Sequence, residues 1–79
     1  MTLDDALELA RLRRHLPSPS ARRRLRERVG LSQEQIAQEL GVDRAAVSRW
    51  ESGVRSPRGA TLRPYVELLE RLAREAAQP

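Results

Sequence analysis

Apolar residues recur every three or four positions along five stretches of the chain, which is the spacing of amphipathic helices. This periodicity predicts helices over residues 3–15, 20–29, 32–40, 43–52 and 61–78. The pattern predicts no strands, and the sequence contains no internal repeat. We therefore expect an all-α fold, a compact five-helix domain.

Residues that favour helix ends stand at the predicted boundaries. Side chains that cap helix N-termini stand at or directly before the start of four of the helices, at Thr2, Ser20, Ser32 and Asp43. Gln35, three residues after Ser32, completes a capping box. Gly41 is the expected left-handed stop of the third helix and leaves only Gly41 and Val42 as the joint before the fourth. Because glycine turns the chain without a side chain, this joint predicts two helices in close contact.

The inward faces of the last three helices predict the core. Its expected members are Ile36, Ala37, Leu40, Val47, Trp50, Leu62, Val66, Leu69, Leu72 and Ala73. Trp50 is assigned to this core, and not to base stacking, because it follows Val47 at helical spacing. The opposite face of the fourth helix is polar or small and carries Arg44, Ala45, Ser48, Arg49 and Ser52. This helix is therefore expected to bury one face and present the other.

The charge of the chain narrows the class of partner. All fifteen cationic residues are arginine, and the net charge is +4. Residues 17–31 carry +4 and residues 43–58 carry +2, on either side of the acidic stretch 32–42 at −2. Arginine offers a planar fork suited to phosphates and guanine edges, so this distribution favours a nucleic-acid partner.

Other classes of function find little support. The chain has no cysteine, no apolar run of membrane-spanning length, and an N-terminus, MTLDD, that is acidic where a secretory signal would be basic. Ser32 and Ser48 have no histidine or carboxylate arranged for nucleophilic catalysis. We expect a cytoplasmic protein that is not an enzyme and has no metal, no cofactor and no membrane contact.

Two adjacent segments resemble a known DNA-binding motif. Residues 20–72 are similar to the helix-turn-helix domain of the lambdoid repressor and Cro family (XRE-like), with SQEQIAQELGV as the positioning helix and DRAAVSRWESG as the recognition helix. Ala37, Gly41 and the aliphatic residues at 36, 40, 42 and 47 match the positions with which that family packs its helix pair. The resemblance implies a repressor-like core to which residues 1–16 add a further helix.

The resemblance also implies roles for individual residues. The residues expected at base edges in the major groove are Arg44, Ala45, Ser48 and Arg49. Those expected at the DNA backbone are Gln33, Ser52, Arg55 and Arg58, the last two from their place in the following loop. Arg26 and Glu51 match positions that form a structural ion pair in parts of the family. The arginines at 22, 23, 24 and 28 are expected mainly in solvent.

We therefore expect three segments: an accessory helix over 1–16, a linker over 17–19 and a DNA-binding domain over 20–79. The expected function is sequence-specific binding of double-stranded DNA by a small phage- or plasmid-type repressor, as a homodimer on a palindromic site on the bacterial nucleoid. The N-terminal helix packs on its own domain or on a protein partner. Two alternatives are an antitoxin whose N-terminal helix binds a toxin, and a protein-interaction adaptor on the same scaffold.

Overall fold

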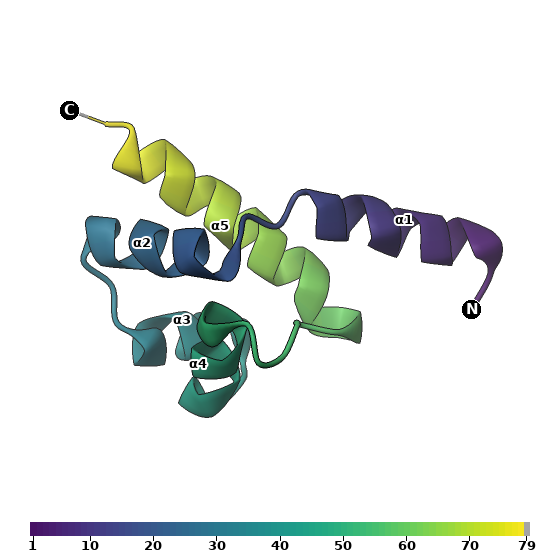
Figure 1. The fold of residues 1–79 in the computed structure, drawn as a ribbon, viewed down its shortest axis with the longest axis horizontal. Helices are drawn as coiled ribbons and strands as arrows, with labels where there is room; N and C mark the ends of the chain where they lie inside the picture. Colours follow the sequence, from purple (N-terminus) through teal and green to yellow (C-terminus); the bar gives the residue numbers. More distant parts are fainter. Residues whose placement is uncertain (79) are drawn as a thin grey trace.

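The fold is a bundle of helices, seen in a computed structural model that describes residues 1–78 (Figure 1). The five α-helices are α1 (Leu3–Arg14), α2 (Pro19–Val29), α3 (Gln33–Leu40), α4 (Arg44–Ser52) and α5 (Leu62–Ala76). A short 3-10 turn, Gly59–Thr61, leads into α5, and no strand occurs within residues 1–78. The predicted all-α class with five helices is confirmed. The predicted domain end at 79 lies outside the described residues.

The start of α2 corrects one predicted boundary. Ser18, not Ser20, is the N-cap: its hydroxyl oxygen accepts a hydrogen bond from the amide of Ala21 at 3.2 Å. Pro19 then occupies the first helical position, where its fixed φ suits a helix and its missing N–H costs no hydrogen bond. The helix therefore begins inside the predicted linker.

The joint between α3 and α4 has the predicted chemistry. Gly41 adopts a left-handed conformation with φ of 69°, and the amide of Val42 donates to the carbonyl of Ala37 at 3.0 Å. Asp43 caps α4 by accepting from the amide of Ala46 at 2.8 Å. Ser32 and Gln35 form the capping box of α3. These bonds satisfy helix-end groups, and the bond from Val42 to Ala37 fixes the turn that joins α3 to α4.

The core lies where α5 crosses α2, α3 and α4 (Figure 1). Trp50 is buried there, with its ring centroid 4.7 Å from that of Tyr65 and the planes tilted by 40°. The other buried apolar residues of this cluster are Ile36, Ala37, Val47, Leu69 and Leu72. Leu40 is only half-buried, and Ala73 is exposed, since only the side of that late turn that carries Leu72 is covered. The core therefore fixes the inner face of α4.

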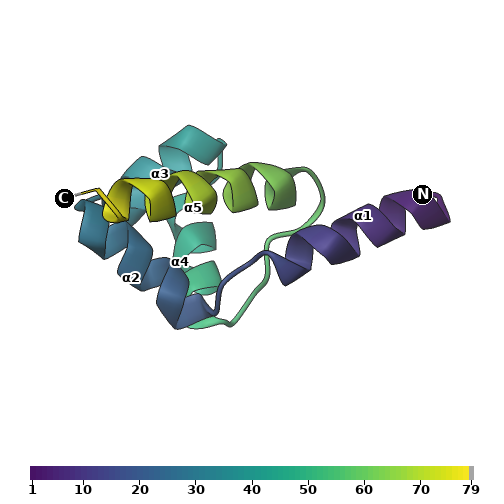
Figure 2. The ribbon, with the colours of Figure 1, turned by 90° about the horizontal axis from the view of Figure 1, so that it is seen from above.

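The helix α1 projects from the bundle along the long axis of the molecule, and both Figure 1 and Figure 2 show it extending beyond the other helices. Its contact with the domain is with α5, and Glu8 pairs with Arg63 of α5. Its residues Leu9 and Leu12 are half-buried, whereas Leu3 and Leu7 are exposed. Helix α1 is thus only partly packed against its own domain.

Within the described residues, none of the helices is long and apolar enough to cross a membrane. No group of three or more His, Cys, Asp or Glu side chains in residues 1–78 is arranged to hold a metal ion.

Candidate nucleic-acid interface

Helix α4 separates its residues sharply between interior and solvent. Val47, Trp50 and Glu51 are buried on its inner side. On its other side, Arg44, Arg49 and Ser52 are exposed, and Ala45 and Ser48 are half-exposed. Because the buried side chains fix the rotation of the helix about its axis, the outward residues form a surface of fixed orientation.

The rotation of α4 is further fixed by an ion pair with α2. Arg26 donates from Nε to Glu51 Oε2 at 2.7 Å and from Nη2 to Glu51 Oε1 at 2.8 Å. The third donor, Nη1, bonds the carbonyl of Leu31 at 2.9 Å. The two side chains are only 12% and 4% exposed, and the hydrogen bond to Glu51 raises the pKa of Arg26 above its usual value. The structure thus contains the ion pair that the sequence resemblance implied.

Gln33, the first residue of α3, extends this network to the surface. Its Nε2 donates to Glu51 Oε1 at 3.1 Å, and its Oε1 accepts from Arg44 Nη1 at 3.3 Å. The guanidinium of Arg44 is exposed, but it is tied through Gln33 to the buried carboxylate of Glu51. Gln33 was expected to contact a phosphate; in the protein alone it joins Arg44 to the interior.

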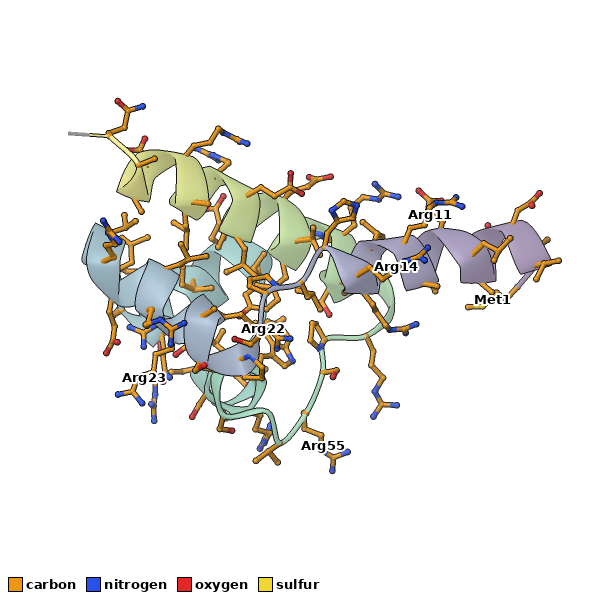
Figure 3. All side chains as sticks on the ribbon, turned by 45° about the horizontal axis from the view of Figure 1, so that its top comes forward. Met1, Arg11, Arg14, Arg22, Arg23 and Arg55 are labelled. Atoms are coloured by element: carbon orange, nitrogen blue, oxygen red, sulfur yellow. The ribbon has the colours of Figure 1, made fainter. Side chains whose placement is uncertain are left out.

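A second group of arginines surrounds a shallow hollow at the other end of α4. The side chains of Arg49, Arg55 and Arg58 line it, together with Ala46, Trp50, Ser56 and Thr61. The loop is held against the helix end because the amides of Val54 and Arg55 donate to the carbonyl of Arg49 at 3.1 and 3.3 Å. The same carbonyl accepts from the Ser52 hydroxyl at 3.1 Å. Arg55 extends from this loop into solvent (Figure 3).

Arg44 and Arg49 therefore lie at the two edges of the exposed side of α4, with further arginines at its C-terminal end. A family model described as "Helix-turn-helix" matches residues 23–75, more than half of the chain. The chain belongs to this family. The helix-turn-helix protein is a DNA-binding transcription regulator of the XRE type, and its family is one of regulators and not of enzymes.

Comparison with curated proteins and with solved structures found no match.

One arginine of the helix-turn-helix domain has a role that the sequence analysis missed. Arg22 was grouped with the solvated arginines of α2, but it is buried. Its Nε donates to the carbonyl of Pro17 at 2.8 Å and its Nη1 to the carbonyl of Trp50 at 2.9 Å. Figure 3 shows it directed inward, whereas Arg23 points outward. Arg22 precedes Arg26 by four residues, which places both on the same face of α2, and that spacing was the available signal.

Tyr65 is the second residue that sequence reasoning did not single out. It packs on Trp50, behind α4. Its hydroxyl is buried and has no hydrogen-bond partner within the described residues. Burial raises the pKa of Tyr65 to about 12, against an opposing effect of the nearby Arg22 charge. Tyr65 and Arg22 thus support the recognition helix from inside.

Proposed function

We propose that the protein is a small Cro-like repressor of phage or plasmid type, which binds double-stranded DNA sequence-specifically with residues 43–52 in the major groove. The observation that carries this proposal is the exposed face of α4, where Arg44 and Arg49 face solvent while Val47, Trp50 and Glu51 anchor the opposite side. An adaptor that does not use DNA has no need of arginines at these two positions.

The base-contacting residues are Arg44, Ala45, Ser48 and Arg49. Each arginine can donate two hydrogen bonds to O6 and N7 of a guanine, which discriminates against the wrong base by roughly 1–3 kcal/mol. Ala45 is small enough to meet a thymine methyl group. The tie from Gln33 restricts the freedom of the Arg44 side chain before DNA arrives, which lowers the entropy lost on binding.

The backbone-contacting residues are Gln33, Ser52, Arg55 and Arg58. Gln33 lies at the N-terminal end of α3, where backbone amides and the helix dipole also favour a phosphate. Its Nε2 carries two hydrogens and donates one of them to Glu51, so the other can be donated to a phosphate oxygen. Arg55 and Arg58, in the loop after α4, would contact phosphates of the DNA strand beyond the end of that helix. These contacts would supply affinity that does not depend on base sequence.

The division of the chain follows from these roles. Because α2 begins at Pro19, the DNA-binding domain begins at residue 19, residues 15–18 link it to the accessory helix α1, and the protein acts in the cytoplasm on the nucleoid. A recognition helix this short contacts few base pairs, so two copies would bind a palindrome with half-sites roughly 34 Å apart. The antitoxin alternative remains tied to α1, whose exposed leucines would then contact a toxin.

Selection of bound duplexes from a randomised pool tests this proposal. The expected result is an enriched, palindromic site with at least one guanine in each half. A folded protein that enriches no sequence would refute it and favour the adaptor.

A further inference from the structure

The outer surface of α1 is apolar and uncovered. Among the described residues, the exposed large apolar side chains are Met1, Leu3, Leu7 and Val54, so three of the four lie at the N-terminal end. Leu3 is 74% exposed, Leu7 is 46% exposed, and α1 buries none of its residues. A helix of 12 residues is only marginally stable in water without packing, so α1 gains from a second contact in addition to α5.

Helix α5 is the other helix with an apolar face that could pair with a second copy, but most of that face is buried. Helix α5 has the strongest apolar stripe of the chain, but its members Leu62, Tyr65, Val66, Leu69 and Leu72 are all buried in the domain core. Leu40 and Leu68, beside this stripe, are half-buried. Leu3 and Leu7 of α1 are exposed, so α1 presents the more exposed apolar face.

The distribution of charge along α1 indicates which kind of partner fits its exposed face. Asp4, Asp5 and Glu8 stand in its first half, and Arg11, Arg13 and Arg14 in its second. Glu8 is engaged by Arg63, whereas Asp4 and Arg11 are exposed and seven residues apart, which places them along the same side of the Leu7 stripe. A helix with opposite charges in its two halves complements a copy of itself that runs in the opposite direction.

We propose that the outer face of α1, formed by Leu3, Asp4, Leu7 and Arg11, pairs antiparallel with the same face of a second copy. In this arrangement Asp4 of each copy faces Arg11 of the other, the two Leu7 side chains pack between these charge contacts, and each Leu3 lies just outside them. A parallel pair would instead oppose Asp4 to Asp4 and Arg11 to Arg11. The seam is isologous, so it gives a two-fold dimer, the symmetry that a palindromic site requires.

The size of the proposed α1 contact and the dimensions of the molecule fit a dimer that binds a palindromic DNA site. In this respect the inference rests on the proposed function. Helix α1 is about 18 Å long and lies along the 41 Å axis of the molecule. An antiparallel α1 pair places the two domains at its opposite ends, and a palindromic site offers two half-sites roughly 34 Å apart. Two such short helices bury less than the roughly 1,200 Å² of a stable interface. The dimer is therefore weak when free and is completed on two adjacent half-sites.

Sedimentation equilibrium of the full chain without DNA, up to millimolar concentration, tests the seam. The wild type should dimerise reversibly. Asp4→Arg and Arg11→Asp should each raise the dimer Kd at least tenfold, because each opposes like charges at both contacts. An equimolar mixture of the two variants should regain the dimer, since each like-charged chain then faces an oppositely charged one. Both variants keep a net positive charge, so overall attraction does not explain such a rescue.

Matched controls use Arg74→Asp, an exposed position on α5 with the same change of charge. It should leave dimerisation unchanged, and adding it to Asp4→Arg should recover no more dimer than adding the wild type does. Circular dichroism shows whether each variant keeps its helices, because Asp4→Arg also removes a favourable charge from the helix N-terminus.

A wild type that stays monomeric at millimolar concentration would overturn the proposal and leave the α1 face to a different protein, such as a toxin. A dimer that survives both charge reversals, or that the mixture does not restore, would also overturn it. Binding to a single half-site duplex separates the two proposals: dimerisation without sequence-specific binding refutes the proposed function and not the seam.

Discussion

At the scale of the residue, the buried carboxylate of Glu51 links the stability of the domain to the outer face of α4, which we propose contacts DNA. It accepts two hydrogen bonds from Arg26 and one from Gln33, and Gln33 in turn holds Arg44. One inward side chain of α4 thereby influences an outward one.

Glu51→Gln should lower the free energy of unfolding by about 3 kcal/mol, because it leaves the charge of Arg26 buried without its counter-charge. Denaturant unfolding monitored by the fluorescence of Trp50 measures this loss. Glu70→Gln, at an exposed position of α5, is the control and should change stability little. A Glu51→Gln protein as stable as the wild type would mean that the pair makes no net contribution.

The single tyrosine gives a pH-dependent prediction. Its pKa in the folded protein is raised to about 12 by burial, against a value near 10 when unfolded. The folded state therefore holds the proton more tightly, and this stabilisation is fully present below pH 10 and is lost as the pH rises toward 12. Absorbance titration of the phenol should show a midpoint well above 10 while circular dichroism still reports a folded protein. A midpoint near 10 in the folded protein would contradict the burial of this hydroxyl.

At the scale of the element, the turn between α3 and α4 depends on backbone conformation alone. Gly41 has φ of 69°, and a Cβ added there would meet no atom within 4 Å. Gly41→Ala should therefore destabilise the domain by about 1 kcal/mol through left-handed strain and not through a steric clash. Thermal unfolding measures the effect, with Gly41→Asn as a milder comparison because asparagine tolerates this conformation better. An alanine variant with an unchanged melting temperature would show that the turn has room to relax.

Local patterns predicted the helices well because their ends carry explicit chemistry, such as the Ser32 capping box and the Gly41 stop. They failed at α2, where Ser18 and Ser20 can both cap and only the fit of Pro19 to the first helical position decides. They also missed the burial of Arg22, because its carbonyl partners come from the loop before α2 and from α4. Such partners depend on tertiary packing, which the spacing of residues in one helix does not specify.

The candidate site, too, could be predicted from the sequence only in part. The outward position of Arg44 and Arg49 follows from helical periodicity, and the structure has both exposed. The tie of Arg44 to Gln33 and the grouping of Arg49 with Arg55 and Arg58 depend on how α3 and the loop after α4 pack, so the sequence alone did not predict them.

At the scale of the whole molecule, the arginines divide into those proposed to contact bases and those proposed to contact phosphates. We expect affinity from the phosphate contacts to depend on salt but not on base sequence. Arg55→Ala should weaken binding about equally on all sequences and reduce the slope of log K against log salt by about 0.9, because one phosphate contact is lost. Fluorescence anisotropy over a range of salt concentrations measures the slope. Arg74→Ala removes the same charge from an exposed position on α5 and should leave the slope nearly unchanged. Equal slopes for Arg55→Ala and the wild type would exclude Arg55 from the interface.

The central claim is that the outer face of α4 distinguishes DNA sequences. Its most direct test compares the affinity of the wild type and of the Arg44→Ala, Arg49→Ala double variant for a selected duplex and for a permuted duplex of the same length and composition. The double variant should lose about 2 kcal/mol or more of the preference for the selected duplex, while its binding to the permuted duplex falls only as expected for two lost charges. An equal loss of affinity for both duplexes would show that these arginines contact only phosphates and that another surface of the protein provides its specificity.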